Sequence, residues 1–422
     1  MRKHVSLLLL LAVLSAAHGQ TLEECQRAAE ANYPLIEKMD LIRQTTALTV
    51  QNIQKGWLPQ VSLTAQATLQ SDVTAFPGQM QDVYRQMGID MKGLKKDQYR
   101  IGIDVQQTVY DGGATRNKKE VARQQELVEE AQNDVGIYNI RRRVNEMYFA
   151  LLMTDEQIQL NRDLQQLLDS SEKKLETMYR NGTAAECDYL SMKAERLNAA
   201  QQQNSLQAQR QTIARMLAIF CGIDITNPVK PKPVSNTEGN NRPELRLIDS
   251  QIKLADAQEK AIDSALMPRL NVFAQGFYGY PGLNMFEDMM RRQWTLNGMV
   301  GARLTWNIGA LYTRKNDKAR LQLMRQTAEN SRDVFLFNSN IEQIQQEDNI
   351  MRYRRMIEED NQIIQLRSKV RKAAESKLKH GIIDMGDLLR EINEENAARL
   401  QQSMHEIEML KEMYNRKLTT NN

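Results

Sequence analysis

Short alternating segments along the chain predict β-strands. Between residues 60 and 71 every second side chain is apolar, and the positions between them are polar. A period of two predicts a strand with one apolar and one polar face. Residues 99–110, 268–280 and 295–308 repeat this alternation, less cleanly in the later two segments. Each predicted strand has the length of about ten residues that a tilted membrane-crossing strand requires.

The segments before and after the paired strands contain few of the residues that end helices. Residues 22–55 are rich in Glu, Gln, Ala and Leu and contain a single proline, Pro34, so we expect a helix there. After Gly113 no proline occurs until Pro228, which predicts one helix from about Ala114 to Arg180. At 1.5 Å per residue this helix would extend ~100 Å.

Two glycines interrupt these long helical stretches. The Asn181-Gly182 pair predicts a reversal, with a return helix that begins near Thr183. In the second half we expect a helix from about residue 312 to residue 380 that turns at Gly381. Helices of this length exceed what a globular domain can use, and they predict a coiled-coil cylinder.

The two halves of the chain carry the same landmarks in the same order. Pro34 and Pro59 lie 25 residues apart, and so do Pro243 and Pro268. Further landmarks also correspond: Tyr110-Asp111-Gly112-Gly113 with Trp306-Asn307-Ile308-Gly309, and Asp188, six residues after Gly182, with Asp387, six residues after Gly381. Such ordered self-similarity predicts a duplicated structural unit.

The duplication sets the predicted domain organisation. Residues 20–226 form a first repeat and residues 242–422 a second, each with a helix, two strands and a long helical hairpin. A proline-rich linker, residues 227–241, joins them. We interpret residues 72–98 and 281–293, between the paired strands, as solvated loops. The fold class is therefore a mixed α and β protein of two similar units.

The start of the chain predicts export. Positive charge in residues 1–4 precedes an apolar run that ends at a small-residue site, so residues 1–19 are expected to be a signal peptide cut after Gly19. The nearest cysteine, Cys25, lies too far from that site for a lipid anchor. No later run reaches the ~18–20 apolar residues of a membrane-spanning helix. If the protein crosses a membrane, we expect it to do so as a β-barrel.

Charge and chemistry exclude several classes of function. The formal charge of +3 includes Arg2 and Lys3, which leaves a nearly neutral mature chain and no case for nucleic acid. The three cysteines are interpreted as isolated thiols. Two histidines, His380 and His405, remain after the signal peptide, without a zinc-protease, nucleophile-elbow or phosphate-loop pattern. We expect no enzyme activity, no cofactor and no metal site.

The number of strands predicts an oligomer. Strands with an apolar face toward lipid must close into a barrel, because open edges cannot stay unpaired in hydrocarbon. Four strands cannot close alone, since the smallest such barrels have about eight. Two chains would give a barrel filled by its own side chains, whereas three would give twelve strands and an open lumen. We therefore expect a homotrimer if the protein is a passage.

The set of landmarks resembles the TolC-type outer-membrane efflux proteins over essentially the whole mature chain. The residues that carry this resemblance are Leu22-Glu23-Glu24, Pro59, Pro268, Asp111-Gly112-Gly113, Asn307-Ile308-Gly309, and the two glycine turns with Asp188 and Asp387. The resemblance implies a trimeric twelve-stranded barrel in the outer membrane that an α-helical periplasmic tunnel continues. It also implies a periplasmic adaptor protein and an inner-membrane transporter as partners.

The resemblance implies sites as well. The turn residues Gly182 and Thr183, and Gly381 and Ile382, would contact the adaptor. Asp188 and Asp387 would ring the periplasmic gate. Arg390 departs from the family pattern, which has another acid there, so a doubled acidic ring is in doubt. An ordinary alternative is that both aspartates complement the dipole of a helix start.

Taken together, these features predict the exit duct of a tripartite efflux or secretion system. Protein secretion of the type I kind remains open, and the 22 methionines leave metal-ion efflux open. A periplasmic coiled-coil scaffold without a pore is the alternative from another class. The four alternating strands argue against the scaffold, because it would have no use for a lipid-facing β surface.

Overall fold

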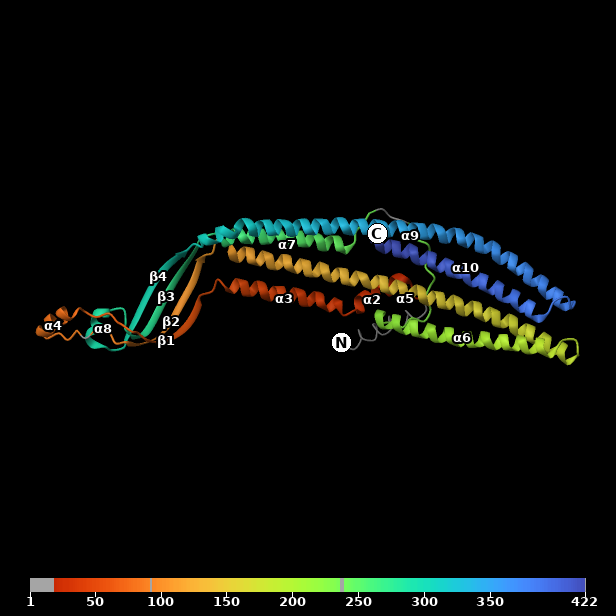
Figure 1. The fold of residues 1–422 in the computed structure, drawn as a ribbon, viewed down its shortest axis with the longest axis horizontal. Helices are drawn as coiled ribbons and strands as arrows, with labels where there is room; N and C mark the ends of the chain where they lie inside the picture. Colours follow the sequence, from red (N-terminus) through yellow and green to blue (C-terminus); the bar gives the residue numbers. More distant parts are fainter. Residues whose placement is uncertain (1–18, 92, 236–238, 422) are drawn as a thin grey trace, which may run out of the picture. The chain divides into compact units, whose positions relative to one another are not determined.

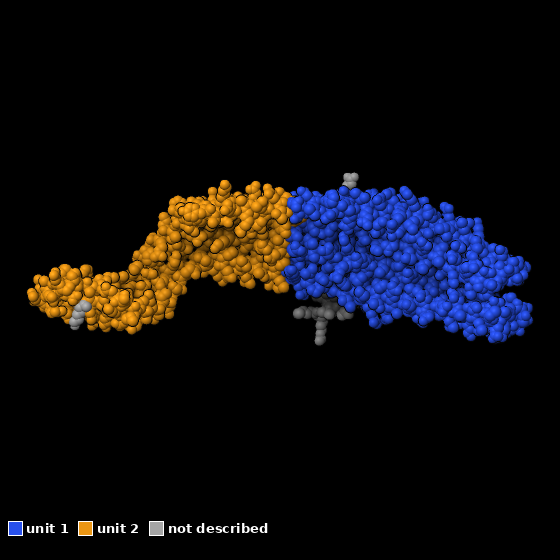
Figure 2. All heavy atoms as spheres, viewed as in Figure 1, with its two compact units in different colours: residues 1–40, 130–247, 330–422 blue, residues 41–129, 248–329 orange. Residues whose placement is uncertain are grey.

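The computed structural model describes residues 19–91, 93–235 and 239–421. The expected signal peptide therefore lies outside the described residues except for Gly19. Contacts divide the chain into two compact units (Figure 2). Unit 1 contains residues 1–40, 130–247 and 330–422, and unit 2 contains residues 41–129 and 248–329. No helix among the described residues is long and apolar enough to cross a membrane.

Both repeats contain a similar series of elements, in which two strands separated by a short helix lead into a long helical hairpin (Figure 1). The first consists of α2 (Leu22–Asn32), α3 (Leu35–Lys55), β1 (Gln60–Leu69), α4 (Gly78–Gln86), β2 (Asp97–Tyr110), α5 (Ala114–Arg180) and α6 (Glu186–Cys221). The second consists of α7 (Pro243–Ala265), β3 (Arg269–Tyr280), α8 (Met285–Arg291), β4 (Thr295–Thr305), the 3-10 turn η2 (Ile308–Ala310), α9 (Leu311–Lys379) and α10 (Met385–Thr420). The mixed helical and four-stranded fold class is confirmed.

Several expected elements differ from those observed. The helix expected over residues 22–55 is broken into α2 and α3, because Tyr33 is extended (φ −74°, ψ 136°) in front of Pro34. A residue before proline is pushed out of the helical region by the proline ring. The segments 72–98 and 281–293, expected as loops, each contain a short helix, α4 and α8.

In unit 2 the four strands form one antiparallel sheet in the order β1-β2-β3-β4. Its register aligns the apolar positions of all four strands on the same face. One row of neighbours across the sheet is Val61, Val105, Ala274 and Val300. The expected alternation therefore persists from strand to strand, and β1 and β4 each have one hydrogen-bonded neighbour in the described chain.

Asp111 explains why α5 begins where it does. Its two carboxylate oxygens accept hydrogen bonds from the backbone N–H groups of Gly113 (2.9 Å) and Thr115 (2.6 Å). These N–H groups belong to a helix start that has no internal partners, so Asp111 caps the helix. Burial would raise the pKa of Asp111, but these hydrogen bonds outweigh burial and lower it below its ordinary value.

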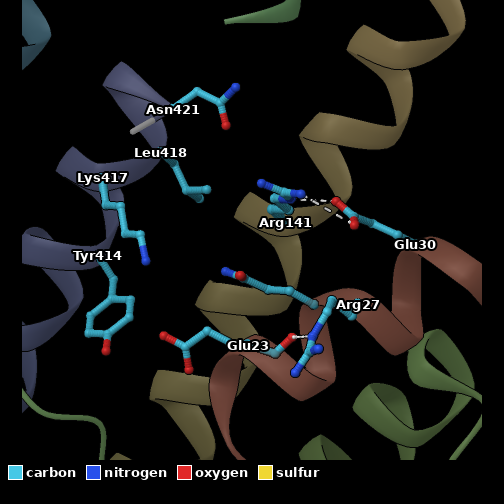
Figure 3. Close-up of a pocket in the computed structure, with 9 residues that line it drawn as sticks. Glu23, Arg27, Glu30, Arg141, Tyr414, Lys417, Leu418 and Asn421 are labelled. Atoms are coloured by element: carbon cyan, nitrogen blue, oxygen red, sulfur yellow. Dashed lines mark hydrogen bonds and ion pairs between the residues drawn. The ribbon is translucent and has the colours of Figure 1, made fainter. Parts of the chain in front are cut away.

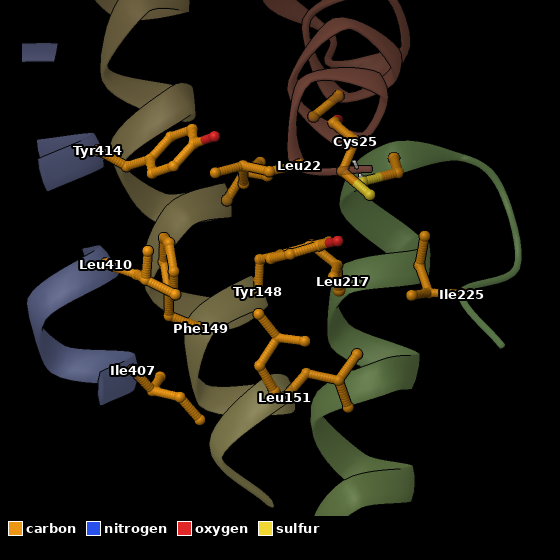
Figure 4. Packing of buried hydrophobic residues seen from close by; sticks show 14 of the residues in the cluster. Leu22, Cys25, Tyr148, Phe149, Leu151, Leu217, Ile225, Ile407, Leu410 and Tyr414 are labelled. Atoms are coloured by element: carbon orange, nitrogen blue, oxygen red, sulfur yellow. Dashed lines mark hydrogen bonds between the residues drawn. The ribbon is translucent and has the colours of Figure 1, made fainter. Parts of the chain in front are cut away.

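In unit 1 the helices pack around two cores. The first contains residues from α2, α5, α6 and α10, among them Leu22, Tyr148, Phe149, Leu217 and Leu410 (Figure 4). The second contains residues from the ends of α5 and α9 and the starts of α6 and α10: Leu168, Leu175, Met192, Ala199, Ala374, Met385, Leu388 and Ile392. The second core holds the two helical hairpins side by side.

Both ends of the described chain bond to the linker between the repeats. The N–H of Gln20 donates to the carbonyl of Asn227 (3.1 Å), and the N–H of Val229 donates to the carbonyl of Gln20 (3.0 Å). At the other end, the N–H of Asn241 donates to the carbonyl of Thr420 (2.9 Å). The linker thus begins beside the start of α2 and ends beside the end of α10.

Candidate functional site

The first helical hairpin reverses through Gly182. This glycine has φ +74°, in the left-handed region that glycine adopts at low cost. The N–H of Gly182 donates to Tyr179 (2.9 Å), and the N–H of Thr183 donates to the carbonyl of Met178 (2.8 Å). These bonds satisfy carbonyls at the end of α5. A Cβ atom built on Gly182 meets nothing within 4 Å, so the reversal is open to solvent.

The second hairpin reverses in the same way. Gly381 has φ +70°, and its N–H donates to the carbonyl of Leu378 (3.0 Å). The N–H of Ile382 donates to the carbonyl of Lys377 (3.0 Å), the same five-residue spacing as in the first turn. Gly381 also has open space around a Cβ position. Thr183 and Ile382 are both exposed, as a docking contact would need.

Asp188 and Asp387 both lie in the first turn of a return helix, α6 and α10 respectively. Both are half-buried. Their environments differ, because Asp384 caps α10 by accepting from the N–H of Asp387 (2.9 Å), whereas Ala185 offers α6 no side-chain cap. The start of α6 thus lacks a capping side chain, and the negative charge of Asp188 in its first turn complements the helix dipole.

Arg390 pairs with Asp387 in the structure. Its Nη2 lies 2.8 Å from Asp387 Oδ1, one helical turn away on α10. The pair is partly exposed, with 66% of the arginine side chain and 39% of the aspartate side chain accessible. An exposed pair of this kind is worth at most about 1 kcal/mol. Its consequence is electrostatic, since the guanidinium offsets the charge of the carboxylate beside it.

Ion pairs between the two helices of each hairpin were not expected from the sequence. Glu395 on α10 is 5% exposed and accepts hydrogen bonds from Arg371 on α9 (2.5 Å) and Arg399 on α10 (2.8 Å). On the first hairpin, Arg196 of α6 pairs with Glu172 of α5. Each return helix is thus tied to its outgoing helix by an Arg–Glu pair. The partners lie 24 residues apart in sequence, a spacing that no local pattern reveals.

The sheet presents a second candidate functional surface. On its apolar face Leu63 is 72% exposed and Val300 is 83% exposed. Leaving such side chains in water forgoes about 1.5–3 kcal/mol each relative to full burial. The exposed apolar side chains of this face extend over all four strands: Val61, Leu63, Ile101, Ile103, Val272, Tyr278, Leu296, Val300 and Leu304. A continuous surface of this kind indicates contact with an apolar medium or partner.

The opposite face of the sheet is polar but carries two aromatic rings. The guanidinium of Arg100 lies 4.4 Å from the ring centre of Phe277, and that of Arg303 lies 5.2 Å from the ring centre of Phe273. Thr64 donates to Asp104 (3.1 Å) on the same face. These cation–π contacts give the two phenylalanines a polar cover. The sequence alternation did not reveal them.

A pocket of about 460 Å³ in unit 1 has a lining of mixed charge (Figure 3). Glu23, Arg27 and Glu30 come from α2, Arg141 from α5 and Lys417 from α10. Arg141 is already paired with Glu30. Among the described residues no group of three or more His, Cys, Asp or Glu side chains is placed to hold a metal ion.

Comparison with known proteins relates the chain to outer-membrane channels. Residues 26–222 match the family model described as "Outer membrane efflux protein". A search of curated protein sequences finds no match. Among solved structures the fold agrees over 94% of this chain with a membrane protein from Pseudomonas aeruginosa (TM-score 0.68, 13% identity, 90% of that chain).

Two further structures agree to a similar extent, again over 94% of this chain. The outer membrane protein VceC from Vibrio cholerae matches with TM-score 0.64 and 14% identity over 94% of its own length. The CmeC outer membrane channel from Campylobacter jejuni matches with TM-score 0.66 and 12% identity over 85% of its length. The family model thus matches the first repeat, and the solved structures share the fold of both repeats.

Proposed function

We propose that this chain, related to the outer membrane efflux proteins, is the outer-membrane exit duct of a tripartite efflux or secretion system. The observation that carries the proposal is the exposed apolar face of the four-stranded sheet, combined with two free sheet edges. A sheet with these properties is stable in hydrocarbon once its edges pair. The sequence match and the shared fold support the same conclusion.

The free edges support a homotrimer. In each chain β1 and β4 have one hydrogen-bonded neighbour, so β4 of one chain can pair with β1 of the next. Three chains supply twelve strands, enough to enclose a lumen. The polar face, with Arg100, Asp104 and Arg303, then lines that lumen, and the apolar face meets outer-membrane lipid.

The hairpin turns at Gly182 and Gly381, with Thr183 and Ile382, are proposed to contact a periplasmic adaptor protein. An inner-membrane transporter would supply the energy. Asp188 and Asp387 are proposed to line the resting periplasmic gate, where Arg390 weakens the negative field. Support comes from the shared geometry of the turns and from the ion pair between Arg390 and Asp387.

Fractionation and mass measurement test this proposal. The protein should be recovered in the outer-membrane fraction, and the detergent-extracted particle should have about three times the mass of the mature chain. A stable monomer would overturn the trimer. Recovery in the soluble periplasm would instead support a scaffold without a pore.

A further inference from the structure

Two of the three cysteines meet in the first core of unit 1. Cys25 on α2 is 0% exposed, and Cys221, the last residue of α6, is 2% exposed. The Sγ of Cys221 donates to the backbone carbonyl of Cys25 at 3.3 Å. Figure 4 places Cys25 among the apolar side chains of this core. All three cysteines are free thiols in the structure, as expected, but two of them lie beside each other.

The surrounding contacts hold α2 against the end of α6. Asn32, the last residue of α2, donates from Nδ2 to the carbonyls of Ile219 (3.1 Å) and Phe220 (3.2 Å). Gly222 then leaves α6 with φ +67°, and a Cβ there would lie 2.6 Å from Asn32 Oδ1. Because these contacts fix both helices on each side of the cysteines, the thiols are brought together by the fold itself.

We propose that Cys25 and Cys221 form a disulfide bond in the exported protein. The proposal rests on the export implied by the proposed function, because disulfides persist in the periplasm and are rare in the cytosol. The oxidant is a protein disulfide of the periplasm. A thiolate of the pair attacks that disulfide, the second thiolate displaces the donor from the mixed disulfide, and the Cys25–Cys221 bond forms. The donor takes up two electrons and two protons and leaves as a dithiol.

The position of the pair determines when the bond forms. Hydrogen bonding to Cys221, together with burial, raises the pKa of the Cys25 thiol. The attacking species in disulfide exchange is the thiolate, and both sulfur atoms are closed off from solvent in the folded chain. Oxidation therefore precedes closure of the core, when the newly exported chain is still open.

Cys187 provides an internal standard for the test. It is exposed and belongs to the first turn of α6, away from the pair. Cells are quenched in acid, and the protein is denatured and labelled with a maleimide carrying a polyethylene glycol tag. One tag before reduction and three after reduction are expected. Three tags before reduction would overturn the proposal.

Single substitutions identify the partners. Cys187→Ser should accept no tag before reduction and two afterwards. Cys25→Ser and Cys221→Ser should each accept two tags with or without reduction, since the remaining thiol of the pair has no partner. A Cys25→Ser protein that still gains a tag on reduction would show that Cys221 bonds elsewhere, and this would overturn the pairing.

The same samples separate this proposal from the proposed function. Three tags before reduction on protein from the outer-membrane fraction would rule out the disulfide but not the proposed channel function. One tag before reduction on protein from the soluble periplasm would support the disulfide and rule out the proposed channel function.

Discussion

Gly182 and Gly381 each allow the chain to reverse between the two helices of a hairpin. A non-glycine side chain in the left-handed region costs about 1–2 kcal/mol. Because a Cβ at Gly182 or Gly381 meets nothing within 4 Å, we expect the variant chains to fold despite that cost. We expect Gly182→Trp and Gly381→Trp to abolish export through a tripartite system while the yield of trimer stays normal. Export is measured as accumulation of a transported dye in cells.

The matched control is Gly182→Asn. Asparagine tolerates the left-handed conformation and is small, so export should remain near the native level. If both tryptophan variants export normally, the adaptor docks elsewhere. Loss of export in the asparagine variant would instead show that the backbone angle matters more than the exposed surface of the turn.

The electrostatic field of Asp387 is offset by its neighbour Arg390. Around a threefold axis three carboxylates ~8 Å apart would repel by about 2 kcal/mol per pair at an effective dielectric of 20. Arg390, 2.8 Å from Asp387, offsets this field. We expect Arg390→Ala channels to be more cation-selective than native channels, as read from reversal potentials in planar bilayers under a salt gradient.

A trivalent cation on the periplasmic side tests the carboxylates themselves. Block of the native channel should weaken in an Asp188→Asn, Asp387→Asn double variant, because the multivalent site is gone. Unchanged block would show that the two aspartates act only at the helix starts, where they complement the dipole.

At the scale of elements, we expect an arginine substitution to change the yield of trimer on one face of a strand and not on the other. Leu63 and Thr64 are neighbours on β1, and their side chains point to opposite faces. An arginine toward lipid costs about 2–4 kcal/mol near the bilayer midplane. Leu63→Arg should therefore reduce the amount of folded trimer in the outer membrane, measured as the heat-resistant oligomer on a semi-native gel.

Thr64→Arg is the control on the same strand. Its side chain would lie on the polar face beside Asp104, where a positive charge gains a partner. Trimer yield should stay near native. Equal losses in both variants would mean that the apolar face does not meet lipid.

The pairing of α9 with α10 depends on Glu395. Burial would raise the pKa of Glu395, but hydrogen bonds from Arg399 and Arg371 outweigh it and hold the pKa below the usual range. Its contribution to stability is thus complete above the ordinary glutamate pKa of about 4.3 and is lost as pH falls through the depressed folded value. Removing one partner of a buried pair costs about 3 kcal/mol.

Glu395→Gln should therefore lower the thermal midpoint at pH 7 and show a weaker decline toward pH 3 than the native protein. Circular dichroism of detergent-solubilised trimer follows both. The control is Glu394→Gln, whose side chain is 48% exposed and pairs with Arg367 at 3.1 Å. Equal effects in the two variants would contradict the importance of burial.

The elements most accessible from sequence were those with a strong local signal. The alternation in β1 is a strong local signal because it runs without interruption from Val61 to Leu69, and Gly182 and Gly381 stand out as the glycines that interrupt two long stretches without proline. The short helices α4 and α8 were missed, since seven to nine residues carry little periodicity. Pro34 breaks the helix because its ring pushes Tyr33 out of the helical region.

The candidate site was predicted less completely, for a physical reason. Asp188 and Asp387 were found through the repeat, which is information within the chain itself. Arg371 lies on a different helix from Glu395, and Cys221 on a different helix from Cys25, so helix packing determines that they meet. For Cys25 and Cys221 the separation is 196 residues, far beyond any local pattern.

At the scale of the whole molecule, the two halves of the chain are similar but unequal. Both halves use a glycine reversal with the same hydrogen-bond spacing, yet only the second has a capping aspartate at its return helix. In a trimer the six reversals would be of two alternating kinds. A partner that contacts all six must therefore accommodate two different surfaces.

The placement of the chain ends has a consequence for how the two repeats are connected. Gln20 bonds beside Asn227 and Val229, where the linker starts, and Thr420 bonds to Asn241, where it ends. A bridge from Thr420 to Gln20 would thus join the same two places that the linker joins. The fold therefore admits circular permutation, with new termini within the linker and the second repeat first in sequence.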